Sequence, residues 1–213
     1  MTGICLGDMC RPGGFEITDR AMAFCCFPPR AKLADIGCGF GATVEHIRKL
    51  YGYEIWGIEK DEEIVKRTRS SFVFKGDSNK LPFTDGELDG IMFECSLSKM
   101  DHPETVLAES RRVLKPQGYL IVSDMYARGK GATLSGLSGR VETKEELCRQ
   151  LTSSGFSILL FEDYSQALKR MWGQLIFQCG SEALWNNLGT NCTEMQLVKC
   201  GYCLIIGQKE EKL

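Results

Sequence analysis

Long apolar segments are missing from this chain of 213 residues. The longest apolar runs, such as 156–161, are far shorter than the roughly 20 residues that cross a bilayer. The first ten residues lack both the basic and the apolar region of an export signal. Acidic and basic residues nearly balance, with a formal net charge of −2, and Lys and Arg are scattered along the chain. We therefore expect a cytoplasmic protein that binds neither membranes nor nucleic acids.

Histidine is scarce, whereas cysteine is abundant. Only two histidines are present, which leaves few candidates for a general base, and the eleven cysteines are many for a cytoplasmic chain. Thiols in that compartment are normally reduced, so we expect no disulfide framework. Cys200 and Cys203 form a CxxC, but no second pair stands at zinc-finger spacing. We expect buried thiols and no metal site.

Glycine is concentrated in the most informative segment of the chain. An apolar, strand-like run over 32–36 ends in alternating glycines, Gly37, Gly39 and Gly41, and a helical pattern begins directly afterwards. Glycine lets the backbone turn sharply and approach a ligand closely, and the N-terminus of the following helix attracts an anionic group. This pattern predicts the first strand-to-helix turn of a nucleotide-type site in an open α/β sheet.

Two cofactors compete for this turn. Gly37, Gly39 and Ala42 satisfy the dinucleotide fingerprint, which is weak on its own. Glu59, at the end of the next apolar run, would bind ribose hydroxyls in either case. Asp35 separates the two, because a carboxylate at the turn offers nothing to a pyrophosphate but attracts a cofactor that carries an ammonium and a sulfonium.

Asp35 and its glycines, Glu59 and Gly76-Asp77 together resemble class I S-adenosylmethionine-dependent methyltransferases. The pattern of that family is Asp-x-Gly-x-Gly-x-Gly, an acid after strand two and Gly-Asp after strand three. Later segments are similar to the quinone-methylating, small-molecule group of these enzymes: 81–83, 87–89 and 112–118, with Gln117 in place of a glycine. The resemblance extends from about Arg11 to the last strand.

Strands and helices alternate along the chain, which predicts a parallel sheet covered on both faces. The resemblance implies a Rossmann-like, doubly wound α/β fold with a seven-stranded, mostly parallel sheet whose last strand is antiparallel. We expect one methyltransferase domain over 1–213. Its first 30 residues form a segment in which Thr18 can cap a helix running to about Phe27. Arg11 there belongs either to a simple Pro-Gly turn or to a lid over the cofactor.

Residues 165–198 predict a helical insertion between the last two strands, with an aromatic stripe at helical spacing. Such a stripe packs into a core or caps a substrate pocket, and both interpretations stay open. On the helix that follows the glycine turn, Val44, Ile47 and Leu50 mark the face expected to be buried.

The resemblance implies S-adenosylmethionine as the cofactor. The two glycines nearest Asp35 permit close approach of the backbone, Asp35 holds the methionine ammonium, and Glu59 takes the ribose hydroxyls. Lys60 lies beside the adenine, and Asp77 accepts a hydrogen bond from the adenine amino group. The predicted cofactor-binding residues are Asp35, Gly37, Cys38, Gly39, Glu59, Lys60, Asp77, Ser78 and Glu94.

Methyl transfer from a sulfonium is an in-line displacement with an activated leaving group, so the protein mainly positions the nucleophile and no metal is needed. The sequence does not identify the catalytic residue. His102 in the loop after strand four, Tyr126 after strand five, and Cys95 are the candidates. The acceptor is expected to be a small molecule, and no motif specifies it or the oligomeric state.

Three other functions remain open. Glu94-Cys95-Ser96 and 122–124 are similar to segments of arsenite methyltransferases, so Cys95 could serve an arsenic or thiol acceptor. A nicotinamide-dependent oxidoreductase would use the same glycine turn. A non-catalytic S-adenosylmethionine-binding protein would keep the pocket without the chemistry.

Overall fold

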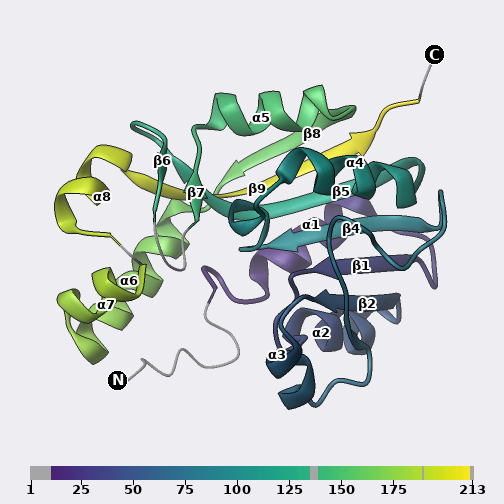
Figure 1. Ribbon diagram of the computed structural model, residues 1–213, viewed down its shortest axis with the longest axis horizontal. Coiled ribbons are helices and arrows are strands. Elements are labelled where there is room, and N and C mark those ends of the chain that lie inside the picture. Colours follow the sequence, from purple (N-terminus) through teal and green to yellow (C-terminus); the bar gives the residue numbers. More distant parts are fainter. Residues whose placement is uncertain (1–10, 135–138, 189, 212–213) are drawn as a thin grey trace.

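The computed structural model describes residues 11–134, 139–188 and 190–211. Its main sheet contains β1 (Lys32–Ile36), β2 (Glu54–Glu59), β3 (Val73–Lys75), β4 (Leu88–Glu94), β5 (Leu114–Ala127), β8 (Phe156–Asp163) and β9 (Cys200–Lys209). The strand order is β3-β2-β1-β4-β5-β9-β8 (Figure 1). Strand β9 is antiparallel to both of its neighbours, and the other pairs are parallel. The predicted seven-stranded, mostly parallel α/β sheet is confirmed.

Helices cover both faces of this sheet (Figure 1). They are α1 (Glu16–Cys25), α2 (Ala42–Tyr51), α3 (Glu62–Arg67), α4 (Pro103–Val113) and α5 (Lys144–Ser153). The insertion between β8 and β9 forms α6 (Ser165–Cys179), α7 (Ser181–Leu188) and α8 (Cys192–Val198). A short 3-10 turn, η1 (Leu97–Lys99), follows β4, and a small hairpin of β6 (Ala132–Thr133) and β7 (Arg140–Val141) follows β5. The sequence did not predict this hairpin.

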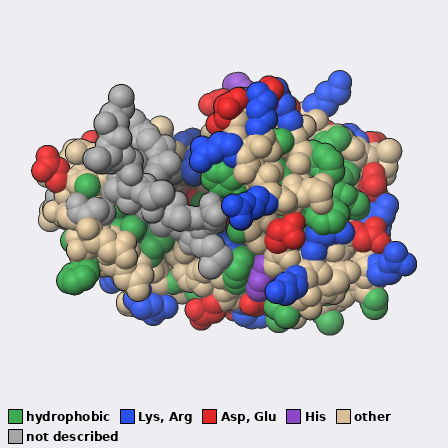
Figure 2. Space-filling model, turned by 90° about the horizontal axis from the view of Figure 1, so that it is seen from below, with side chains coloured by type: hydrophobic (Ala, Val, Ile, Leu, Met, Phe, Trp, Pro, Cys, Tyr) green, Lys and Arg blue, Asp and Glu red, His purple; other side chains and the backbone are tan. Residues whose placement is uncertain are grey.

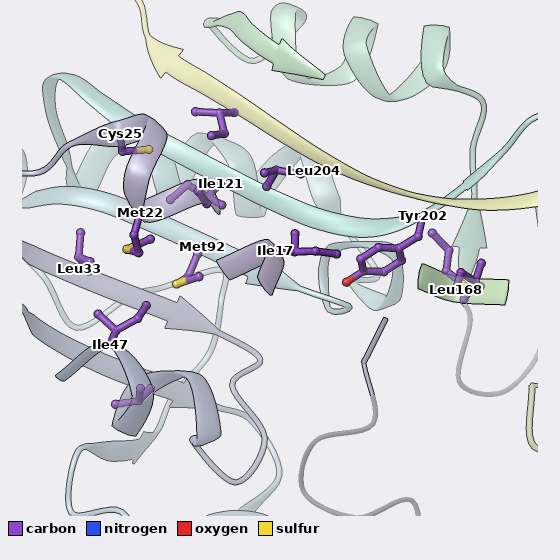
Figure 3. Close-up of a cluster of buried hydrophobic side chains, with 14 of the residues drawn as sticks. Ile17, Met22, Cys25, Leu33, Ile47, Met92, Ile121, Leu168, Tyr202 and Leu204 are labelled. Atoms are coloured by element: carbon purple, nitrogen blue, oxygen red, sulfur yellow. The ribbon is translucent and has the colours of Figure 1, made fainter. Parts of the chain in front are cut away.

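The sheet separates two apolar cores. One core, drawn in Figure 3, packs α1, α2 and α6 against the sheet and includes Ile17, Met22, Ile47, Leu168 and Tyr202. The other packs α4 and α5 against the opposite face. Both cores hold the strands rigidly, so the loops at their carboxyl ends have a fixed base.

The CxxC of the last strand is divided between these cores. Cys200 belongs to the core of α1 and α2, and Cys203 to the core of α4 and α5. Side chains alternate between the faces of a strand, so positions three apart face opposite sides. Within the part of the chain that the structure describes, cysteines form no disulfide and no group of three His, Cys, Asp or Glu side chains could hold a metal ion.

Two local predictions are wrong. Thr18 lies inside α1 instead of capping it, and its hydroxyl donates to Glu94 Oε1 at 2.6 Å. Leu50 is 61% exposed. The buried face of α2 runs through Thr43, Val44 and Ile47, and Tyr51 extends it, which turns position 50 toward solvent.

The one departure from the family pattern occurs in the turn at the start of β5. Gln117 adopts a φ of 61°, in the left-handed region that glycine occupies without a steric penalty. Its amide donates to Glu211 Oε1 at 3.1 Å, and its carbonyl accepts from Gln208 at 3.0 Å. The turn therefore keeps the glycine-type conformation although the residue has changed.

Charged side chains are mixed on the surface. Figure 2 shows Lys, Arg, Asp and Glu interspersed over one face, without a field of one sign. None of the helices in the described ranges combines the length and the apolar character that a bilayer crossing requires.

Candidate functional site

A cavity of about 400 Å³ lies at the carboxyl ends of β1, β2 and β4. Ligands of open α/β sheets bind at this edge, beside the point where the strand order reverses. Five of the nine predicted cofactor-binding residues line the cavity: Gly37, Gly39, Glu59, Lys60 and Ser78. The structure thus brings together residues from three separate strand ends.

The glycine turn forms the floor of this cavity. Gly37, with a φ of 72°, donates from its amide to the carbonyl of Ile58 at 2.8 Å. A Cβ on Gly37 would lie 2.7 Å from the Cβ of Ser96, whose hydroxyl donates to the carbonyl of Ile36 at 2.6 Å. Gly39 has a φ of 56°, and a Cβ there would meet no atom within 4 Å. The two glycines therefore serve different purposes: Gly37 permits packing of the loop after β4, and Gly39 leaves space.

Glu59 is held at the cavity wall by two backbone amides. Its Oε2 accepts from the amide of Gly39 at 2.9 Å, and its Oε1 accepts from the amide of Asp61 at 3.0 Å. Each carboxylate oxygen keeps a second lone pair that these bonds do not use. The carboxylate is thus oriented for a further pair of hydroxyl donors, such as a ribose diol.

The loop after β3 supplies the rim. Ser78 donates to the sulfur of Met100 at 3.4 Å, and Lys60, which also lines the cavity, is exposed. Asp77 is exposed and stands between Gly76 and Ser78, which line the cavity, although it does not line the cavity itself. Its Oδ1 accepts from the backbone and side-chain amides of Asn79, both at 2.9 Å, and these bonds lower the pKa of Asp77.

Asp35 and Glu94 form a second, buried group behind the glycine turn. Glu94 is bound by Arg11, Thr18 and Thr43, with 2.6 Å to each threonine hydroxyl, and its side chain is 7% exposed. Asp35 is 2% exposed, and its Oδ1 has no hydrogen-bond partner among the described residues. Burial, followed by the charge of Glu94, raises the pKa of Asp35 well above the usual carboxyl range. Neither carboxylate lines the 400 Å³ cavity.

Cys38 contributes its backbone to the turn, while its side chain packs against β2. A Cβ on Gly57 would lie 2.5 Å from the Cys38 sulfur, which shows how closely the thiol approaches that strand. Burial, with the nearby charges of Asp35 and Glu59, raises the pKa of this thiol. Cys38 is therefore a packed thiol at neutral pH.

Of the three catalytic candidates, Cys95 alone reaches the cavity as the described residues define it. Its sulfur lies 3.1 Å from the hydroxyl of the buried Tyr202, and burial raises the pKa of the thiol to about 12. Tyr126 is buried beneath β8, where its hydroxyl donates to Asp163 Oδ2 at 3.1 Å. The side chain of His102 is 72% exposed, at 3.7 Å from Glu104.

Sequence reasoning missed the residues that cover the cavity from the side of β4. These are Ser96, Lys99 and Met100 in and around η1. The turn is anchored by Asp124, which accepts from the amide and the hydroxyl of Ser98, each at 3.0 Å. Their position after a strand end was a usable signal, but no local motif predicts that η1 folds back over the cavity.

A second cavity of about 390 Å³ lies between the turn before α1 and the insertion helix α6. Arg11, Gly13 and Gly14 line it on one side, and Arg170 and Met171 on the other. The guanidinium of Arg11 also reaches Glu94, the neighbour in sequence of Cys95 in the first cavity. Arg11 is therefore common to the second cavity and to the buried carboxylate group.

Comparison with known proteins finds similarity to one family over part of the chain. Residues 34–122 match the model of a methyltransferase domain. The ubiquinone/menaquinone biosynthesis C-methyltransferase UbiE of Paraburkholderia phymatum is 34% identical over 104 residues, which cover 44% of this chain and 43% of that protein. The chain spans about half the length of the curated relatives it matches.

Solved structures of similar fold extend over nearly the whole chain. The [4+2]-cyclase SpnF is 24% identical, with a TM-score of 0.72, and the match covers 92% of this chain and 80% of that one. Phosphoethanolamine N-methyltransferase 2 of Haemonchus contortus, in complex with S-adenosyl-L-methionine, is 15% identical, with a TM-score of 0.71 and coverage of 94% and 54%. At these identities the likeness shows the fold.

Proposed function

We infer that this chain, a class I S-adenosylmethionine-dependent methyltransferase by family match and fold, transfers a methyl group from S-adenosylmethionine to a small-molecule acceptor. One observation carries this proposal. The glycine turn after β1 and the carboxylate of Glu59 after β2 face one cavity at the carboxyl edge of the sheet.

The residues of this cavity fit the adenosyl part of the donor. Glu59 is oriented by two amides to accept from the ribose hydroxyls. Ile58 and Met100 offer apolar walls for the adenine ring, and Ser78 supplies a hydroxyl at its edge. Asp77 keeps its free Oδ2 for the adenine amino group, because Asn79 uses the other oxygen.

Asp35 and Glu94 fit the methionine part, which carries an ammonium. Asp35 lies near the end of β1 and Glu94 at the end of β4, both side chains are largely buried, and when both are ionised their charge exceeds the single positive charge of Arg11. Bound S-adenosylmethionine supplies an activated methyl group on a sulfonium. The protein then has to hold the acceptor in line, exclude water and surround the positive centre with polar groups.

The acceptor is proposed to enter from the side of the N-terminal segment and α6. The cavity between Arg11 and Arg170 lies there, and Met171 and Leu175 give it an apolar wall. Trp172 and Trp185 pack edge to face beneath it, with ring centroids 5.7 Å apart, and so hold α6 on α7. On this basis residues 165–198 cap the substrate, and the segment before β1 forms the opposite lip.

Among the other functions, none has a specific observation in its favour. The methyltransferase-domain match opposes a nicotinamide-dependent oxidoreductase. An arsenic acceptor needs a thiolate, whereas Cys95 is a half-buried thiol with a raised pKa. SpnF has a similar fold but is named as a cyclase, so a shared fold does not determine the reaction. We also propose a cytoplasmic location, in keeping with described cysteines that form no disulfide.

Two measurements test this function in sequence. Isothermal titration with S-adenosylhomocysteine and, in parallel, with NAD should detect binding of the first only. Incubation with methyl-labelled S-adenosylmethionine and small-molecule pools, including quinone precursors, should then yield a labelled product. Preferential binding of NAD would refute the cofactor assignment. Binding of S-adenosylhomocysteine without any labelled product from a broad acceptor panel would instead favour the non-catalytic binding protein.

A further inference from the structure

Among the carboxylates that the structure describes, Asp35 is the one with a buried oxygen that lacks a hydrogen-bond partner. Its side chain is almost completely buried, and its Oδ1 lacks a hydrogen-bond partner among the described residues. A buried charged carboxylate without partners is strongly unfavourable. Asp35 lies near the end of β1, beside the turn proposed to bind the donor, so we interpret its unsatisfied carboxyl group as functional.

The charges around Asp35 explain why no neighbour neutralises it. Arg11 pairs through Nη1 with Glu94, which also accepts from two threonine hydroxyls. Its Nη2 has no hydrogen-bond partner among the described residues, and its charge lowers the pKa of Asp35 without outweighing burial and the charge of Glu94, which raise it. Glu59 faces Asp35 from β2 and adds a second repelling carboxylate. The thiol of Cys38 is the other titratable group next to it. His46 and Asp19, where α1 meets α2, pair with each other at 2.6 Å.

We propose that Asp35 is protonated in the unliganded chain and that uptake of the methyl donor releases this proton to solvent. The inference rests on the proposed function, because the donor must bring the cation. Its α-ammonium supplies the counter-charge that Arg11 cannot give to two carboxylates at once. The buried group is then electrically neutral in both states: a neutral acid beside the Arg11–Glu94 pair before binding, and two paired carboxylates afterwards.

Two consequences follow from linkage. Below the raised pKa of Asp35, the affinity for the donor increases with pH, by up to about tenfold per unit, because one proton leaves for each ligand bound. The unliganded chain behaves in the opposite sense. Its folded state binds more protons than its unfolded state, so its stability falls as pH rises from the ordinary carboxyl range toward the raised pKa.

The direct test is a proton count in the wild-type protein. S-adenosylhomocysteine is titrated calorimetrically at one pH near 6 in two buffers that differ in ionisation enthalpy. The expected result is release of up to one proton per ligand, with affinity rising as pH increases from the ordinary carboxyl range toward the raised pKa of Asp35. The matched control ligand is 5′-methylthioadenosine, which lacks the ammonium, and its binding should release no proton.

Variants separate Asp35 from its neighbours. Asp35→Asn should bind S-adenosylhomocysteine more weakly and without pH dependence, and its stability should no longer fall as pH rises. His46→Gln, the matched control at the ionisable pair where α1 meets α2, should keep the pH dependence of the wild type.

The outcomes distinguish this proposal from the function on which it rests. Failure of S-adenosylhomocysteine to bind at any pH would overturn the proposed function. Tight binding with no released proton, or a pH dependence that persists in Asp35→Asn, would overturn the proton coupling alone. A pH dependence lost in His46→Gln would assign the proton to His46 and also overturn it. The buffer comparison on the wild type decides the question even if Asp35→Asn does not fold.

Discussion

Two glycines of one turn predict stability losses of different size when each is replaced by alanine. Gly37 and Gly39 both have positive φ values, 72° and 56°, so either substitution places an L side chain in the left-handed region. That backbone conformation costs about 1–2 kcal/mol for a residue with a Cβ. The two sites differ in what the new methyl group meets.

At Gly37 the methyl group collides with the protein. It would lie 2.7 Å from the Cβ and 3.3 Å from the Oγ of Ser96, which is buried and bonded to the carbonyl of Ile36. Moving this side chain adds about 1–3 kcal/mol of overpacking. We expect Gly37→Ala to lose about 2–5 kcal/mol of unfolding free energy in total. At Gly39 no atom lies within 4 Å, so Gly39→Ala should lose only about 1–2 kcal/mol.

The loss of ligand affinity is expected at Gly39, which is the site where the loss of stability is smaller. Gly39 lines the cavity and donates its amide to Glu59, so the methyl group of Gly39→Ala is expected to occupy space that the ligand needs. This variant should remain folded but bind S-adenosylhomocysteine at least about tenfold more weakly, a loss of about 1.4 kcal/mol. Denaturant unfolding without ligand measures the first quantity, and isothermal titration the second. Equal stability losses at the two sites, or unchanged affinity in Gly39→Ala, would refute the division of roles between them.

Three further substitutions test the remaining contacts. Glu59→Ala should weaken the binding of S-adenosylhomocysteine by about 10- to 100-fold, because it removes charge-assisted hydrogen bonds worth about 1.5–3 kcal/mol. A titration that gives wild-type affinity would show that Glu59 does not bind the ligand. Cys95→Ser should keep that affinity within about twofold and keep methyl transfer to the labelled acceptor, since the sulfur is a thiol bonded to Tyr202; loss of turnover alone would instead support a thiolate acceptor site. With a pKa of about 12, Cys95 in the wild type should react slowly with iodoacetamide near neutral pH, and the rate should climb about tenfold per pH unit because only the thiolate reacts. Gln117→Gly should stabilise the chain by about 1 kcal/mol in denaturant unfolding, because it relieves the steric strain of a non-glycine residue in the left-handed conformation. A loss of stability would show that the contact with Glu211 outweighs this strain.

The sequence by itself determined the parts of the site that depend on neighbouring residues. The run over 32–36 became β1 with the same bounds, because an apolar strand and the glycines after it specify their own backbone conformation. The place of Glu59 at the end of the next strand was predicted in the same way, and its role toward a ligand stays a prediction. Alternating strands and helices predicted a parallel sheet, since parallel neighbours require such crossovers, and the family resemblance supplied the seventh, antiparallel strand.

Only the tertiary structure decided which side chains meet across long separations. Arg11 and Glu94 are 83 residues apart, and Cys95 and Tyr202 are 107 residues apart, so no local pattern reports either contact. Thr18, read as a helix cap, turned out to be a ligand of Glu94 for this reason. The protonation states of Asp35 and Cys95 are set by burial and by charges from other strands. These are properties of the packed core, and a linear motif carries no information about them.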